Sequence, residues 1–301
     1  MDIQDFPRIY GSCDGLVCLA PFFDNICIWN PATREYKKAP EPLARFPHAH
    51  GFGFDCKNDD YKVVRIGRAE DSDQTVEGVE LFEACVYSLA SNSWKNLGII
   101  RYGFSEVSDN GFHLNGVCHW IANTTDERTG TVSAVVVCFD FSDETFYDLP
   151  LPKNNSSKGG KLPRWDLGIW EGKLCLLCGN GMGCQVDVWT MTDNKWSKHS
   201  SITALIADMN YKSPIQTLQN GEILFLSAHR EEYGLHFISY DPKLERPRAM
   251  KIHGFSGEDD EVVTYIETLI GLNSGTYVGK KKKNRVPKKK QILMTDMDLE
   301  S

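Results

Sequence analysis

Trp189-Thr-Met-Thr-Asp-Asn-Lys-Trp196 decides the fold, because the chain repeats its pattern. The pattern holds an aromatic residue, a small hydrogen-bonding residue, a polar pair, and a second aromatic residue seven positions after the first. Three further copies are complete, and a fifth has Pro247 in place of the second aromatic residue. The first aromatic residues lie 50 to 58 positions apart, at Trp29, Tyr87, Phe139, Trp189 and Tyr240. Self-similarity at one period of about 50 residues indicates a repeat architecture.

Each copy is interpreted as a β-hairpin. Val186, Val188 and Thr190 alternate with Asp187, Trp189 and Met191, which is the periodicity of a strand. The pair Asp193-Asn194 favours a turn, because short polar side chains bond the nearby backbone and tolerate unusual dihedral angles. The other copies carry the pairs Thr33-Arg34, Ser91-Asn92, Asp143-Glu144 and Leu244-Glu245 at this place. The side chains that follow the repeat, among them Asp140, Asp187 and Asp241, are therefore predicted to form hairpin hydrogen bonds rather than a catalytic carboxylate set.

Two more strands precede most hairpins. Turn dipeptides such as Asp14-Gly15 and Asn115-Gly116 lead into apolar runs, and Asp59-Asp60 stands in this place in the second unit. Before these turns come short strand-like segments at 50–54, 111–114, 166–170 and 214–218. Four antiparallel strands in about 50 residues, repeated five times, predict a single all-β propeller with five four-stranded blades, or six if another unit lies upstream.

The first unit is predicted to lack its first strand, because only ten residues precede Gly11. The strand-like run at 262–270 follows the last complete unit. We expect this run to pair into the first blade and to close the ring, since open sheet edges promote aggregation.

Composition limits the class of protein. The chain has 301 residues and a net charge of −8, with no apolar run long enough to cross a membrane and no secretory signal at its start. Ten cysteines without a signal predict free thiols in a reducing compartment. Residues 280–301 carry a charge of +5, so the remainder carries −13. An acidic body argues against general nucleic-acid binding.

Three connections interrupt the repeat, namely an acidic insertion at 67–80, a polar linker at 152–164 and a Gly- and acid-rich segment at 254–261. The tail at 274–301 is predicted to be disordered. Its lysine cluster has the composition of a nuclear-import signal, or of a solvated tail or phosphate-attracting patch; the cluster is Lys280, Lys281, Lys282, Lys283, Arg285, Lys288, Lys289 and Lys290.

Five motifs in order resemble the plant F-box-associated (kelch-like) interaction domain, the group that includes the S-locus F-box proteins. They are Gly11-Ser-Cys-Asp-Gly-Leu-Val-Cys-Leu19, Ile28-Trp-Asn-Pro-Ala-Thr-Arg-Glu-Tyr36, Gly51-Phe-Gly-Phe-Asp55 with Asp60-Tyr-Lys-Val-Val-Arg65, Val86-Tyr-Ser-Leu with Ser93-Trp-Lys95, and Tyr265-Ile-Glu-Thr-Leu-Ile270. The resemblance covers residues 9–273, after a short lead at 1–8.

The resemblance implies the substrate-recognition part of an SCF-type ubiquitin ligase. In that family an N-terminal F-box binds a Skp-type adaptor and, through it, a cullin, while the propeller-like domain captures the target protein with its loops. The F-box is missing before Gly11, so a truncated adaptor or competitor that binds a target without ligase recruitment is the alternative. We expect a cytoplasmic or nuclear protein with no cofactor, no nucleic-acid partner and no membrane partner.

Other patterns could carry chemistry. Cys175-Leu-Leu-Cys178 has the spacing of a zinc or redox site, but positions i and i+3 of a strand point to opposite faces, so we expect structural burial. His48-Ala-His50 is expected at a surface or turn rather than on a metal. No P-loop, Rossmann, H-E-x-x-H or G-x-S-x-G motif occurs. Gly179-Asn-Gly-Met-Gly183 is interpreted as a hairpin loop. The rival function, a propeller enzyme, would need carboxylates or metal ligands converging at one end of the channel.

Overall fold

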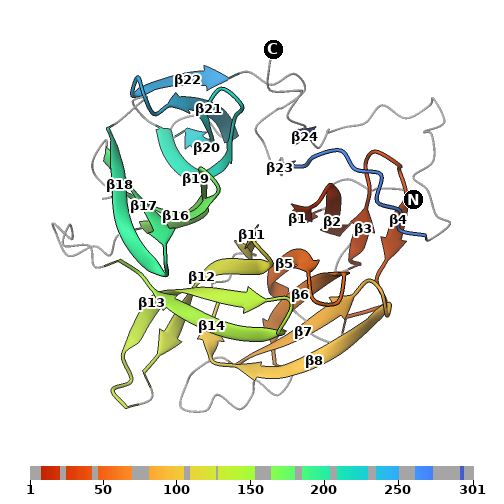
Figure 1. Ribbon diagram of the computed structural model, residues 1–301. Coiled ribbons are helices and arrows are strands. Elements are labelled where there is room, and N and C mark those ends of the chain that lie inside the picture. Colours follow the sequence, from red (N-terminus) through yellow and green to blue (C-terminus); the bar gives the residue numbers. More distant parts are fainter. Residues whose placement is uncertain are drawn as a thin grey trace. The chain divides into compact units, whose positions relative to one another are not determined.

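The computed structural model describes residues 8–20, 25–42, 47–69, 81–104, 109–126, 128–152, 164–179, 185–203, 209–229, 235–250, 262–273 and 292–294. These residues form β-strands, turns and extended segments (Figure 1). Among them there is no helix that could cross a membrane. The chain divides into two compact units, one of residues 1–150 with 265–289 and one of residues 151–264 with 290–301.

The first unit holds three sheets, each built from strands that pair in chain order. The first sheet contains β1 (Arg8–Cys13), β2 (Leu16–Ala20), β3 (Cys27–Trp29) and β4 (Tyr36–Lys38). The second contains β5 (Pro47–Asp55), β6 (Asp60–Arg68), β7 (Phe82–Ser88) and β8 (Ser93–Ile100), with β10 (Asp109–Asn110) parallel to β5. The third contains β11 (Phe112–Leu114), β12 (Val117–Thr125), β13 (Val132–Asp140) and β14 (Thr145–Pro150), with β9 (Tyr102–Gly103) beside β12.

The second unit holds two sheets of the same kind and one short parallel pair. Its first sheet contains β15 (Arg164–Trp170), β16 (Lys173–Gly179), β17 (Gln185–Thr192) and β18 (Lys195–Thr203). Its second contains β19 (Met209–Thr217), β20 (Ile223–His229), β21 (Leu235–Asp241) and β22 (Arg246–Met250), and β23 (Val262–Thr264) pairs with β24 (Ile292–Met294). The described part of the chain therefore contains five four-stranded antiparallel meanders, as the repeat predicted.

The predicted turn chemistry is confirmed by the backbone. The second residue of every polar pair has a positive φ, between 50° and 62°; these residues are Arg34, Asn92, Glu144, Asn194 and Glu245. Asp14-Gly15, Asn115-Gly116 and Glu171-Gly172 have positive φ at both positions, which matches the right-handed twist of the flanking strands. Asp59, at the turn without glycine, has a φ of 52°.

The repeated aromatic residues lie opposite one another in three units. Trp29 pairs with Tyr36, Tyr87 with Trp94, and Phe139 with Phe146. The repeated spacing predicts that these aromatic residues are core rather than a stacking platform for a ligand. Tyr87, Phe139 and Tyr240 follow this prediction, because they are buried in the apolar clusters of their units.

The fourth unit departs from the pairing that these three units share. Its turn contains only Asp193 and Asn194, so Trp196 lies opposite Met191 and Trp189 lies opposite Lys198. Both tryptophans are half-buried, and neither belongs to the apolar cluster formed around Trp170. The expectation that Trp196 is core is therefore wrong, because the shorter turn shifts the register of the return strand.

Two expectations about the ends of the repeat array need correction. The first sheet does have a first strand, since β1 pairs with β2 across the Asp14-Gly15 turn. The run at 262–270 does not pair as a strand with that sheet: β23 covers Val262–Thr264 only and pairs with β24, and residues 265–273 are in no strand. Instead, Asn30 binds this segment through its side chain.

Candidate functional site

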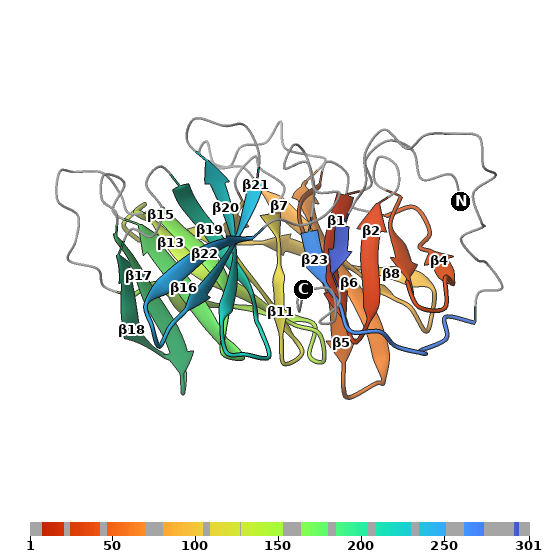
Figure 2. The ribbon, with the colours of Figure 1, turned by 90° about the horizontal axis from the view of Figure 1, so that it is seen from above.

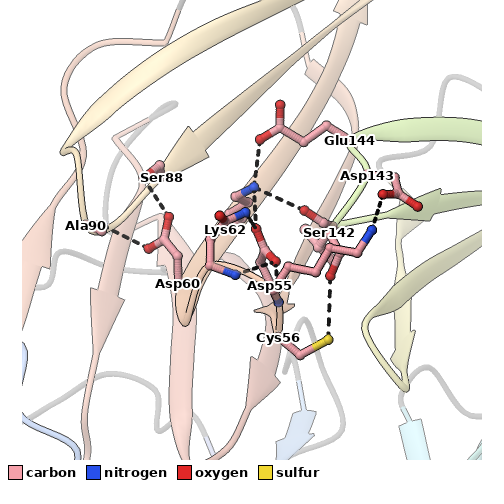
Figure 3. A network of polar contacts seen from close by, with 12 residues as sticks. Asp55, Cys56, Asp60, Lys62, Ser88, Ala90, Ser142, Asp143 and Glu144 are labelled. Carbon is pink, nitrogen blue, oxygen red and sulfur yellow. Dashed lines mark hydrogen bonds and ion pairs between the residues drawn. The ribbon is translucent and has the colours of Figure 1, made fainter.

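The tight turns of the first unit carry the most extensive polar network among the described residues (Figure 3). Asp55 ends β5, and its Oδ1 accepts hydrogen bonds from the backbone amides of Lys57 at 2.9 Å and Asn58 at 3.1 Å. Asp140 ends β13 and does the same for Ser142 and Asp143 at 2.8 and 3.1 Å. These Asp side chains therefore fix the two turns, as predicted for Asp140.

Lys62, on β6, lies at the centre of this network (Figure 3). Its Nζ lies 2.7 Å from Asp55 Oδ2, 2.7 Å from Glu144 Oε1 and 3.1 Å from the carbonyl oxygen of Phe141. Glu144 also contacts Lys95, whose Nζ lies 2.5 Å from Oε2. The Lys62 side chain is buried and has its donors occupied, so the cluster joins the turn of the second sheet to the turn of the third.

The charges of this cluster are held in their ionised forms. Burial alone would lower the pKa of Lys62, but bonds to Asp55 and Glu144 outweigh burial and raise it. Burial alone would raise the pKa of Asp55 and of Glu144, but hydrogen bonds led by Lys62 lower both. A general acid or base works best with a pKa near the working pH. Each shift moves the pKa further from neutral pH. The cluster is therefore suited to holding the sheets together rather than to proton transfer.

Weaker contacts surround the cluster at the same edge. Lys57 pairs with Asp143 at the surface, and Cys56 Sγ lies 3.7 Å from Ser142 Oγ. Asp60 accepts from Ser88 Oγ at 2.6 Å and from the amide of Ala90 at 2.9 Å.

The first sheet is tied to the second in the same way. Tyr61 donates to Asp14 at 3.2 Å, and Lys37 donates to the carbonyl oxygen of Leu89 at 2.9 Å. Trp94 Nε1 donates to the carbonyl oxygen of Pro40 at 2.9 Å. Side-chain contacts thus link the three sheets of the first unit in succession.

The sequence-predicted Cys and His candidates lie apart from this network. Cys175 and Cys178 are both buried on β16 and face different strand partners, Thr190 and Asp187. Within the described ranges no three His, Cys, Asp or Glu side chains are placed to hold a metal ion. Burial raises the pKa of the Cys175 thiol, so the expected structural role of Cys175 is supported.

His48 and His50 are not at a surface or turn, so that expectation is wrong. Both are buried on β5, because this inner strand is covered on both sides. His48 meets the ring of Phe82 edge-on at 5.1 Å, and His50 stacks on Tyr10 at 3.7 Å. Burial, followed by the charge of Arg65, holds the pKa of His50 well below its ordinary value.

Asp187 and Asp241 also follow the prediction. Asp187 Oδ1 accepts from Ser201 Oγ at 2.8 Å and lies 2.9 Å from Lys198 Nζ across its hairpin. Asp241 Oδ1 accepts from the amides of Lys243 and Leu244 in its turn. Several predicted segments lie outside the described residues: 70–80, 153–163, 180–184, 254–261 and the lysine cluster of the tail.

The sequence model of the F-box associated beta propeller domain matches residues 2–274. The chain belongs to this family. The predicted all-β propeller fold and the resemblance noted above are therefore confirmed.

Relatives of this F-box associated propeller are F-box proteins of Arabidopsis thaliana. F-box protein CPR1 is 27% identical over 215 residues, which cover 64% of the chain and 51% of CPR1. F-box protein At3g07870 is 26% identical over 288 residues, covering 82% of the chain and 66% of the relative. The chain therefore spans about half to two thirds of the length of these relatives. The solved SapL1 lectin, at 12% identity and a TM-score of 0.46, covers 83% of the chain with 81% of its own length.

Proposed function

We propose that this propeller captures a target protein for an SCF-type ubiquitin ligase, as its non-catalytic recognition part. The observation that carries the proposal is the family match over residues 2–274, together with relatives that are F-box proteins. The geometry of the first unit supports it, because the ionised cluster at Lys62 is suited to holding sheets in place rather than to reaction chemistry. A rigid scaffold with variable connections is the usual way to build a recognition surface.

The target is proposed to bind at connections that do not follow the repeat. At the edge of the Lys62 cluster, the turns are short, and side chains of the second sheet bond side chains of the third. β6 ends at Arg68 and β7 begins at Phe82, at the strand ends opposite the tight turns. The sequence between these two strands is longer than the repeat requires and contains Glu70, Asp71 and Asp73. An acidic connection suits a target with a basic surface.

The direct test is affinity purification with two baits. One bait is this chain, and the other is this chain joined behind the F-box of CPR1. Both baits should recover the same target, but only the fusion should recover the Skp-type adaptor and the cullin and lower the amount of target in cells. Recovery of the adaptor and cullin with both baits would contradict the proposal that the F-box supplies ligase recruitment. Failure of the two baits to share any target would contradict capture by the propeller.

Paired variants then locate the binding surface. Replacing Glu70, Asp71 and Asp73 by the matching amides should reduce target recovery several-fold without lowering the melting temperature. The matched control, Lys57→Ala with Asp143→Ala, removes an exposed ion pair from the opposite edge and should leave recovery unchanged. If the Lys57 and Asp143 variant loses recovery and the amide variant does not, the target binds at the tight-turn edge instead.

A further inference from the structure

Residues 265–273 follow a defined path along the first sheet without joining it as a strand. Asn30 Nδ2 donates to the carbonyl oxygen of Thr268 at 3.0 Å and to that of Ile270 at 2.8 Å. The backbone amide of Leu272 donates to Glu35 Oε2 at 2.8 Å. Figure 2 shows this segment, in blue after β23, passing along the lower edge of β2 and β4. All three bonds are made by side chains of the β3–β4 connection. The segment is therefore held through side chain–backbone hydrogen bonds rather than through a backbone ladder between strands.

Asn30 is held ready for this contact. Its Oδ1 accepts from the backbone amides of Ala32 at 2.9 Å and Thr33 at 3.2 Å, which fixes the plane of the side-chain amide. Asn30 is completely buried, and Glu35 is buried beside the segment. Loss of the segment would remove the backbone groups that bind the Asn30 amide and Glu35 Oε2. Buried polar groups without partners are costly, so this groove favours an occupied state.

From Thr268 to Leu272 the side chains alternate between the groove and solvent, whereas Ile266 is exposed. Thr268 and Ile270 are half-buried and Leu272 is buried, whereas Leu269 between them is 87% exposed. Ile270 and Leu272 complete the apolar cluster of the first two sheets, which contains Tyr10. The groove therefore selects an extended peptide with apolar residues two positions apart.

Gly15 adds a steric condition. A Cβ atom at Gly15 would lie 2.3 Å from the carbonyl oxygen of Ile266 and 2.5 Å from Thr268 Cγ2. The absence of a side chain at this turn lets the backbone of the segment approach the first sheet closely. Gly15, Asn30 and Glu35 thus form one groove, called here the Asn30 groove.

We propose that the Asn30 groove is an exchangeable peptide-binding site and that its partner in trans is the 266–272 segment of a second copy of this chain. The peptide sequence that fits the groove is carried by the chain itself. Its departure breaks the side-chain hydrogen bonds of Asn30 and Glu35 and uncovers the apolar cluster that Ile270 and Leu272 complete, but it unzips no strand ladder in the described residues. The chain passes from the second unit back to the first between Thr264 and Tyr265, so the segment begins directly after this change of unit.

Mass action sets the conditions for exchange. A tethered segment has an effective concentration of the order of millimolar, so cis binding dominates in dilute solution. Exchange between copies becomes visible when cis binding is impaired in one copy and intact segments are supplied by another. Exchange of an identical element between copies is a low-cost route to a dimer.

The test uses two full-length variants with complementary defects. Ile270→Asp with Leu272→Asp spoils the segment but leaves its groove intact. Asn30→Asp spoils the groove, because a carboxylate cannot donate to the carbonyl oxygens, but it keeps the Oδ1 acceptor for Ala32 and Thr33 and leaves the segment intact. Each variant alone should be monomeric by light scattering, and an equimolar mixture should form a heterodimer. A mixture that stays monomeric would overturn the second copy as partner.

Peptide binding tests the groove independently of dimer formation. A fluorescent peptide of residues 265–273 should bind the Ile270→Asp, Leu272→Asp chain at least tenfold more tightly than it binds the wild-type chain, whose own segment competes. The same peptide with both Asp substitutions should not bind. If the double variant does not fold, Leu272→Ala serves in its place. Equal affinity of the wild-type chain and the segment variant for the peptide would overturn the exchangeable site.

Discussion

Lys62 Nζ and Glu144 Oε1 lie 2.7 Å apart, although the two residues are 82 positions apart in the chain. Their contact joins the second sheet to the third. The partners are unequal in their surroundings, since the Lys62 side chain is 7% exposed and that of Glu144 is 18% exposed. Removing one partner of a buried ion pair leaves an uncompensated charge, whereas removing an exposed pair has little effect. The contact is therefore a sensitive point for the stability of the first unit.

Lys62→Met should lower the free energy of unfolding by about 3–5 kcal/mol, because it leaves the buried Asp55 carboxylate without its cation. Lys57→Met is the matched control. Lys57 also pairs with an Asp in these turns, but its side chain is 58% exposed, so the substitution should leave the free energy of unfolding nearly unchanged. Urea unfolding followed by circular dichroism measures both. Equal effects of the two substitutions would show that burial of Lys62 is not decisive.

The stability of the first unit should fall in acid. The pKa of Asp55 and that of Glu144 are lower in the folded chain than their ordinary values of 3.8 and 4.5. The folded state therefore holds these protons less tightly than the unfolded state, so the stabilisation is complete above the ordinary values and is lost as the pH falls below about 4.5. Melting temperatures measured from pH 7 to pH 3 should show this decline. Lys62→Met should make the decline shallower, and an unchanged slope would contradict the assignment.

Trp170 and Trp196 should differ in their contribution to stability. Trp170 is 1% exposed and belongs to the apolar cluster with Phe225 and Tyr240, so Trp170→Ala should cost about 3–5 kcal/mol. Trp196 is half-buried on β18 outside that cluster, so Trp196→Ala should cost less, about 1–2 kcal/mol. Thermal unfolding of the two variants ranks them, and the opposite order would contradict the shifted register.

Gly15 and Gly172 form a matched pair for the Asn30 groove. Both occupy the second position of a tight turn, with φ of 83° and 71°, so an alanine at either position meets similar backbone strain of about 1 kcal/mol. A Cβ at Gly15 would clash with the 266–272 segment, while nothing lies within 4 Å of one at Gly172. Gly15→Ala should therefore be the more destabilising by about 1–3 kcal/mol. Hydrogen exchange at the Leu272 amide should also accelerate in Gly15→Ala and not in Gly172→Ala.

Local features of the fold could be predicted from the sequence, because their causes are local. The polar pairs specify turns through their own backbone conformation, so five hairpins were predicted at their observed places. The prediction that Trp196 is core was wrong, since a two-residue turn and a four-residue turn leave the same spacing of aromatic residues but a different register. β1 (Arg8–Cys13) was missed because the prediction considered only the ten residues before Gly11, whereas the strand includes Gly11 and continues to Cys13.

The long-range features had no local signal. Lys62 and Glu144 belong to different repeats, and neither stands out in a sequence in which a quarter of the residues are charged. Alternation of apolar residues at 268–272 indicates an extended segment, but it cannot distinguish a strand in a ladder from a peptide bound by side chains. The role of Asn30 depends on this second kind of contact. The run at 262–270 was therefore predicted as a strand, but beyond Thr264 it is a segment bound by the side chain of Asn30.

The contact between Asn30 and Ile270 also bears on how the chain folds during its synthesis. The two residues are 240 positions apart, which corresponds to roughly 12–48 s at about 5–20 residues per second. Throughout that interval the first sheet has left the ribosome with its groove vacant and the Asn30 amide without the carbonyl oxygens it binds in the folded chain. The first sheet is thus made long before the segment that completes it, and its exposed groove defines a window in which chaperones or a neighbouring nascent chain can engage it.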